Sequence, residues 1–290
     1  MSKLNTEMTG APAIAMTGKK AIEIVGKDAI EVIGRKADAF NVPETPPIPP
    51  YTNTSYLSIG SAANAGHFET DSLNMSPSES FSYSYWIKVP NISTSYTNAL
   101  YTTIHDGTRD QYNRLEPFQH QFRGNSSNYI ALGGSYIKFS SNYDTGNWVH
   151  IVVTWSNANV TSSTSITSSL LLSNTTLYIN GAWSQLHSPA GTASLTGASL
   201  LDKFRIGDAV TSYIEPSFSI SDIAIWKGTE LSSTQVSEIY GTGTPDNIRA
   251  IANMPTPTRY YLFEDATDPN YEEISQSSLG TSSNGTITSY

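Results

Sequence analysis

The chain has 290 residues, and its 16 Lys and Arg against 25 Asp and Glu give a formal net charge of −9. Charged residues make up 14% of the sequence, against roughly 25% in ordinary soluble domains, whereas aromatic residues reach 11%. The lack of cysteine excludes a disulfide framework and a cysteine metal site, no run of about 18 apolar residues predicts a membrane span, and no signal-peptide core opens the sequence.

An octapeptide repeat occupies residues 13–36, and each unit ends in Gly followed by two charged residues. The Ile and Val residues of each unit favour a short strand, and the Gly and charged pair favour a turn. A helix would lose about 1 kcal/mol at every Gly, so we interpret the repeat as extended β-structure. The residues expected to carry assembly or anchoring are Ile14, Ile22, Ile24, Ile30, Val32, Gly18, Gly26 and Gly34.

Units of this length bury little apolar surface alone, so residues 1–42 are interpreted as an arm that packs on further copies or on another protein. The alternative is a frayed tail, which the regular Ile spacing disfavours because disordered tails are poor in β-branched residues. Residues 43–50 contain five prolines and predict a semi-rigid polyproline spacer. Residues 51–290 then form the third part, a single domain that holds the whole −9, since residues 1–50 carry equal numbers of acidic and basic side chains.

Residues 51–290 show many short strand patterns separated by turn signals. Large apolar residues alternate with Ser from Phe81, a mostly β-branched and apolar strand pattern runs over Trp148–Trp155, and Thr176–Trp183 contains an Asn-Gly hairpin signal. Further strands are expected at Phe204–Gly207, Phe218–Trp226, Tyr260–Phe263 and Gly285–Thr288. This spacing predicts an all-β sandwich or jelly roll.

One short helix is expected, over residues 232–241. Ser232 and Gln235 have the spacing of a capping box, Val236, Ile239 and Tyr240 form one apolar stripe, and Gly241 suits a C-cap. Because the helix has only about two turns, it should pack on the edge of the sandwich.

Four stretches carry a family resemblance. They are Phe81–Pro90, Asn147–Trp155 with the Leu-Tyr-Ile-Asn-Gly string of Leu177–Gly181, and Phe218–Tyr240. Over roughly residues 55–243 the body resembles a laminin-G-like, concanavalin A-like lectin/glucanase jelly-roll domain of the kind found in marine bacteriophage virion proteins. The resemblance implies a structural or glycan-binding role and no reaction.

A polar loop at His105–Arg114 concentrates charge in a charge-poor protein. Carboxylate, amide and aromatic groups together suit sugar hydroxyls or a calcium ion. The alternative is a solvated loop with internal salt bridges. No cofactor is required, and calcium at Asp106 and Asp110 is the candidate metal site, with Tyr112 and Trp183 as stacking residues. The candidate ligand-binding residues are His105, Asp106, Arg109, Asp110, Tyr112 and Trp183.

The sequence gives little support to catalysis. The closest string to a glucanase Glu-x-Asp-x-x-Glu motif begins at Glu69 and Asp71 but lacks the second Glu, and retaining hydrolysis needs two carboxyls about 5 Å apart. The five histidines show no metal-ligand spacing, and His150 falls inside a core strand pattern, so a structural role is expected for it.

The resemblance, together with the repeat arm, implies a non-enzymatic viral structural protein. We expect a phage capsid decoration or head-fibre protein, a homo-oligomer that docks on the major capsid or another virion protein through its arm. It would be assembled in the host cytoplasm, lie on the virion surface and display a jelly roll to host glycans, without nucleic-acid or membrane partners. The alternatives are a lectin-like receptor-binding module of a tail fibre and a carbohydrate-active enzyme.

Overall fold

The computed structural model describes residues 55–60, 66–89, 99–109, 115–123, 128–132, 135–139, 146–191, 195–207, 217–245, 247–264, 271–273, 275, 277–278, 280–283 and 285–289. In β4, β5 and β6, introduced below, the side chains described are those of 102–106, His120 and Ile130. The repeat arm and the Pro-rich spacer lie outside the described residues, so they stay predictions.

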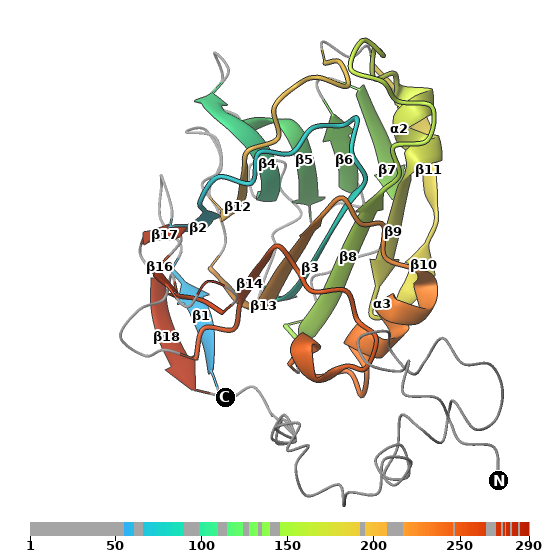
Figure 1. Ribbon diagram of the computed structural model, residues 1–290. Helices are drawn as coiled ribbons and strands as arrows, with labels where there is room; N and C mark the ends of the chain where they lie inside the picture. The colour runs from blue at the N-terminus through green and yellow to red at the C-terminus, as the bar shows by residue number, and fades with distance from the viewer. Residues whose placement is uncertain are drawn as a thin grey trace, which may run out of the picture. The chain divides into compact units, whose positions relative to one another are not determined.

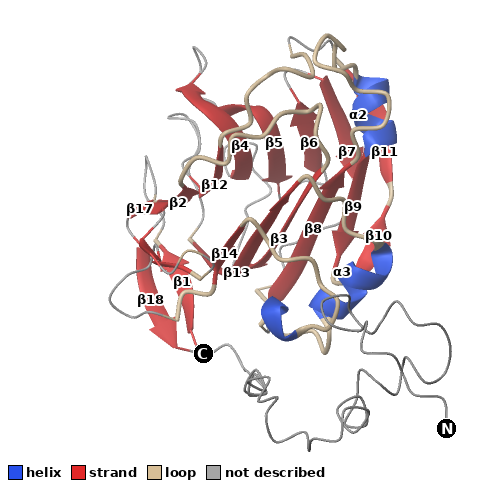
Figure 2. Cartoon of the chain, viewed as in Figure 1, coloured by secondary structure: helices blue, strands red, loops and turns tan. Residues whose placement is uncertain are grey.

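Two antiparallel sheets form the body, as Figures 1 and 2 show. The first sheet has the order β10-β9-β8-β3-β13-β1-β18, and β14 adds to β13. Its central strands β3, β8 and β13 are buried on both faces. Most of their residues are accordingly apolar or have small side chains. The strands are β1 (Ser55–Ile59), β3 (Phe81–Lys88), β8 (Trp148–Trp155), β9 (Thr175–Ile179), β10 (Ala182–Ser184), β13 (Phe218–Lys227), β14 (Arg259–Tyr261) and β18 (Gly285–Ser289).

The second sheet has the order β11-β7-β6-β5-β4-β12-β2-β17. Its strands are β2 (His67–Thr70), β4 (Ala99–Arg109), β5 (Leu115–Arg123), β6 (Asn128–Leu132), β7 (Ser135–Phe139), β11 (Leu186–Ala190), β12 (Lys203–Gly207) and β17 (Gly280–Ser283). The chain crosses from one sheet to the other at both sides of the sandwich, between β10 and β11 and between β17 and β18 (Figure 1). A separate pair joins β15 (Tyr271–Glu272) to β16 (Ser277–Ser278).

The main core lies between the two sheets and contains side chains from both, such as Tyr83 of β3 and Phe204 of β12, whose rings lie 5.2 Å apart. Trp155 is fully buried there and donates its indole N–H to the carbonyl of Pro77 at 2.9 Å. These features confirm the predicted all-β jelly-roll class.

The expected helix is present as α3 (Ser233–Tyr240). Ser232 and Gln235 form the capping box, and Gly241 ends the helix with φ of 52°. Val236 and Ile239 of α3 pack with Val152 and Ala224 of the first sheet in a second apolar cluster. The helix therefore covers part of the outer face of the first sheet.

The prediction of a single helix is wrong. A second helix, α2 (Ser168–Asn174), follows the N-cap Thr167 and precedes β9, and a 3-10 turn, η5 (Ile248–Ala250), lies after α3. The connection between β8 and β9 is thus a helical excursion, although the two strands pair antiparallel as the motif predicted. None of the helices in the described part of the chain has the length and apolar character needed to cross a membrane.

Candidate functional site

The first five residues of the predicted polar loop belong to a strand, and residues 110–114 lie outside the described residues. β4 continues through Arg109, so His105, Asp106 and Arg109 belong to the second sheet, whereas Asp110 and Tyr112 lie outside the described residues. Of the residues in this stretch with a described side chain, Asp106 is exposed and His105 is buried. His105 is therefore buried in a charged cluster on a strand, which corrects the expectation of a loop at this position.

Glu69 of β2 is the centre of that cluster. His105 donates a hydrogen bond through Nε2 to Glu69 Oε2 at 3.0 Å, and Lys203 Nζ lies 3.2 Å from Oε1. Arg205 adds Nε at 2.6 Å and Nη2 at 2.5 Å from Oε2. One buried carboxylate thus faces three basic side chains.

Strand register explains this convergence. Arg205 lies directly opposite Glu69 in the β12–β2 pair, and Lys203 lies opposite His105 in the β12–β4 pair. Lys203 and Arg205 are two residues apart in β12, so both point to the same face of the sheet. Phe204 between them points into the core instead.

The Glu69 carboxylate stays ionised because of these partners. Burial would raise its pKa, but the hydrogen bond from His105 and the charge and hydrogen bonds of Arg205 outweigh burial and lower the pKa to about 2. A glycosidase acid needs the opposite shift, since it must hold a proton near neutral pH.

Asp71, the other carboxylate of the glucanase-like string, is also engaged. Arg259 contacts it with Nε at 2.6 Å from Oδ1 and Nη2 at 2.8 Å from Oδ2, a bidentate pair. That pairing raises the pKa of Arg259, because the guanidinium is stabilised by the hydrogen bonds and charge of Asp71. Glu69 and Asp71 therefore serve two separate ion pairs.

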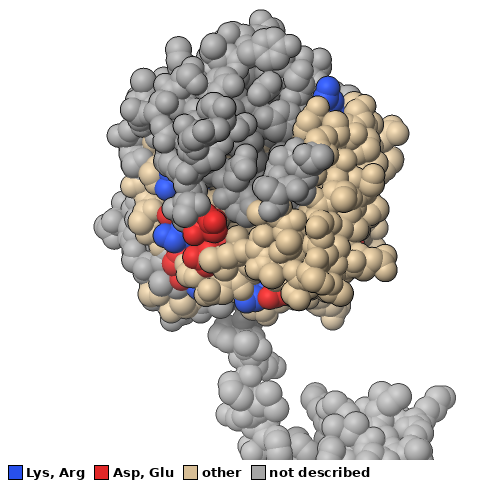
Figure 3. Space-filling model, turned by 90° about the horizontal axis from the view of Figure 1, so that it is seen from above, with Lys and Arg blue, Asp and Glu red and all other residues tan. Residues whose placement is uncertain are grey.

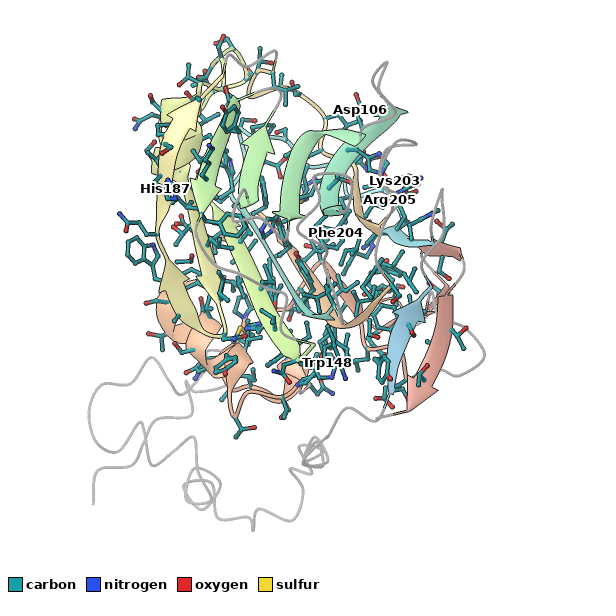
Figure 4. The ribbon with its side chains drawn as sticks, turned by 180° about the vertical axis from the view of Figure 1, so that it is seen from behind. Asp106, Trp148, His187, Lys203, Phe204 and Arg205 are labelled. Atoms are coloured by element: carbon teal, nitrogen blue, oxygen red, sulfur yellow. The ribbon has the colours of Figure 1, made fainter. Side chains whose placement is uncertain are left out.

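Trp183 is distant from the charged cluster in the fold. It lies on β10 at the edge of the first sheet, whereas β2, β4 and β12 are strands of the second sheet at the other side of the molecule (Figure 1). Figure 4 likewise shows Asp106, Lys203 and Arg205 together on one side and His187 on the opposite side. The structure thus does not bring Trp183 into one site with His105 and Asp106.

The exposure of Trp183 is unusual within the chain. Among side chains that the structure describes, two large apolar ones are exposed, Trp183 at 65% and Leu200 at 44%. Trp86, Trp155 and Trp226 are buried. An exposed indole on an edge strand is an open stacking surface.

The calcium prediction stays without a described site. In the ranges the structure describes, no group of three or more His, Cys, Asp or Glu side chains could hold a metal ion, and Asp110 lies outside those ranges.

Figure 3 shows where charge gathers on one face: acidic and basic side chains lie next to one another, beside a wide uncharged area.

His150 has the structural role that its strand pattern indicated. Its Nε2 lies 2.8 Å from Ser84 Oγ, its ring stacks on Trp86 with centroids 4.8 Å apart, and burial lowers its pKa to about 3. It is therefore a neutral core residue.

Sequence reasoning missed Lys203, Arg205 and Arg259 as partners of the Glu69 and Asp71 carboxylates. The Lys-x-Arg alternation in a predicted strand was the available signal, because it places two cations on one face of a sheet. Their partner on β2 lies more than 130 positions earlier in the sequence, so the pairing itself follows only from the register.

Comparison with solved structures finds several partial likenesses. A heptameric SAP-like pentraxin from Limulus polyphemus has 14% identity and a TM-score of 0.43, covering 82% of this chain and 94% of its own. A candidate carbohydrate-binding protein from Bacteroides ovatus has 13% identity and a TM-score of 0.49, covering 81% of this chain and 60% of its own. The binding domain of botulinum neurotoxin DC, solved with SialylT, has 15% identity and a TM-score of 0.39, covering 66% and 43%.

The chain thus spans less than two thirds of the last two structures. A comparison with curated proteins finds no match. The family comparison is decisive, because the model described as the concanavalin A-like lectin/glucanases superfamily matches residues 61–237, more than half of the chain. The chain belongs to the concanavalin A-like lectin/glucanase superfamily.

Proposed function

We propose that this chain is a non-enzymatic surface protein of a virion, whose jelly-roll body binds glycans and whose N-terminal arm docks on a capsid or other virion protein. The superfamily name contains two activities, lectin and glucanase, so family membership leaves a choice between binding a sugar and hydrolysing it. The single observation that favours the lectin is the state of Glu69 and Asp71.

Each of these carboxylates is committed to basic partners. Glu69 is held ionised by His105 and Arg205, so it cannot act as the proton donor of glycoside hydrolysis at neutral pH. Asp71 is held by Arg259. Retaining and inverting hydrolysis both need a protonated carboxyl beside a second carboxylate, and this pair does not provide one.

The virion assignment is supported by the sequence outside the described residues. An octapeptide repeat followed by five prolines in eight residues suits a module that is held at a distance from the surface it decorates. The net charge of −9 in residues 51–290 makes nucleic acid an unsuitable partner for the body. In this proposal the protein lies on the virion surface as a homo-oligomer.

Two measurements test this proposal. The full chain should bind immobilised oligosaccharides and release no reducing sugar from them during prolonged incubation. Deletion of residues 1–42 should leave a folded body that still binds saccharide but no longer co-sediments with particles. Hydrolysis by the wild-type chain that is lost in Glu69→Gln would assign it instead to the carbohydrate-active enzymes.

A further inference from the structure

A long stretch of the chain carries no charge. Residues 145–201 contain no Asp, Glu, Lys or Arg, although they span β8, α2, β9, β10 and β11. The polar side chains of this stretch are mostly Ser, Thr and Asn, which offer hydroxyl and amide groups without a net field. A surface of this composition matches a ligand that is itself uncharged and rich in hydroxyls.

Trp183 stands out on this neutral stretch as an aromatic platform. It lies directly opposite Tyr178 in the β9–β10 pair, so the two side chains share the outer face of the first sheet. Burial decreases along this row towards the edge: Val152 of β8 is fully buried, Tyr178 is half-buried and Trp183 is 65% exposed. Tyr178 packs against the cluster under α3, and Trp183 extends beyond it.

The preceding turn anchors the backbone that carries Trp183. Asn180 and Gly181 have φ of 51° and 74°, which is the geometry of a type I′ hairpin turn. His150 N–H donates to Asn180 Oδ1 at 2.9 Å, and Asn180 N–H donates to the His150 carbonyl at 2.9 Å. A Cβ on Gly181 would lie 2.9 Å from Tyr240 Cδ1, so the turn packs tightly against α3. An anchored backbone lowers the entropy that is lost when a ligand binds to the side chain it carries.

One carboxylate lies near Tyr178, the partner of Trp183 in the β9–β10 pair. Glu230 directly precedes Leu231, which belongs to the same apolar cluster that Tyr178 packs against. Glu230 is exposed, and together with burial its negative charge raises the pKa of Tyr178. A carboxylate near the Tyr178 phenol supplies a strong acceptor for ligand hydroxyl groups.

We propose that Trp183 and Tyr178, with the adjacent Glu230 carboxylate, form a binding site for a neutral saccharide. The apolar C–H face of a pyranose ring stacks on the indole, whose π-face is electron-rich, and Glu230 accepts from the ring hydroxyls. This inference rests on the proposed glycan-binding function and gives it a location and a ligand class.

The same geometry disfavours acidic glycans. Residues 145–201 supply no Lys or Arg that could pair with a sialate, uronate or sulfate, and Glu230 would repel such groups, as would the −9 of residues 51–290. The basic residues that follow this stretch in the sequence, Lys203 and Arg205, belong to the second sheet and face Glu69. Neutral and sialylated versions of one oligosaccharide should therefore be distinguished by this site.

Nuclear magnetic resonance can address the site directly because the full chain has five tryptophans. Each gives one indole N–H signal, and the signal absent from Trp183→Phe identifies Trp183. The probes are neutral gluco-, galacto- and manno-oligosaccharides, with sialylated and sulfated counterparts of the galacto-series. The Trp183 signal is expected to shift with a neutral probe, while the signals of the buried Trp86, Trp155 and Trp226 stay in place.

Substitutions distinguish saccharide binding at Trp183 from glycan binding elsewhere on the chain. Trp183→Ala should weaken binding at least about tenfold, Trp183→Phe should retain most of it, and Leu200→Ala, an exposed apolar control on the same stretch, should change nothing. Unchanged binding in Trp183→Ala, or preference for the sialylated probes, would overturn the inference and leave glycan binding intact. If the wild-type chain binds none of the probes, the glycan-binding function itself fails.

Discussion

Neutralising Glu69 should destabilise the body in a pH-dependent manner. The carboxylate is 6% exposed, and its pKa falls from the ordinary 4.5 to about 2 in the folded protein. At about 1.4 kcal/mol per pKa unit this difference corresponds to about 3 kcal/mol of stability at pH 7. Because the folded pKa is lowered, this contribution is present above pH 4.5 and is lost as the pH falls towards 2.

The assay is urea unfolding of the wild type and of Glu69→Gln at pH 7 and pH 3. Gln keeps the shape but removes the negative charge that Lys203 and Arg205 face, so the variant should lose about 3 kcal/mol at pH 7. About 2 kcal/mol of the wild-type advantage should be gone by pH 3, since the unfolded chain then takes up the proton.

Glu238→Gln serves as the matched control. Glu238 lies on the exposed face of α3, and its substitution should alter the unfolding free energy by less than about 0.5 kcal/mol at either pH. A Glu69→Gln cost below about 1 kcal/mol at pH 7, or one equal at pH 7 and pH 3, would refute the reasoning from the ion cluster.

Three further predictions concern single residues. Gly181→Ala should cost more than about 1 kcal/mol in thermal unfolding, because the residue has φ of 74° and its new Cβ would meet Tyr240; a neutral effect would show that the turn is loose. Ser232→Ala should cost about 1 kcal/mol through loss of the capping box with Gln235, and an unchanged melting temperature would argue against that cap. His150 has a pKa lowered to about 3, so its imidazole resonances should not titrate between pH 8 and pH 5, and a midpoint near pH 6.5 would contradict its burial.

The strands with strong local signals could be predicted from the sequence. The apolar run of Trp148–Trp155 became β8, and the Asn180-Gly181 pair forms the hairpin turn that its composition indicates. The α3 boundaries followed from Ser232 and Gly241, since caps are local chemistry. In these segments the tertiary environment and the local preference agree.

The helix α2 could not be predicted in the same way. Its sequence, Ser168–Asn174, is seven residues long and opens with two serines, which are mediocre helix formers. Its stability comes from packing, because Leu171 is fully buried in the main core. Helices this short depend on tertiary contacts and not on propensity.

The candidate sites, like the helices, could be predicted only in part from the sequence. The residue types at His105 and Trp183 suggested one ligand site, but sheet order separates them. The Glu69 cluster depends on the register of β2, β4 and β12, which sequence spacing does not encode. Trp183 is exposed on the edge strand β10, outside the apolar cluster that α3 covers, so pattern alone could not distinguish it from a core tryptophan.

Docking through the N-terminal arm is tested most directly by co-sedimentation with purified virus particles. Particles that lack the chain are mixed with the full chain or with the chain from residue 43 onward, and bound protein is imaged by cryo-electron microscopy. The full chain should decorate the particle surface with its jelly roll outward, and the truncated chain should remain in the supernatant. Equal binding of both forms, or no binding of the full chain, would contradict a virion protein anchored by its arm.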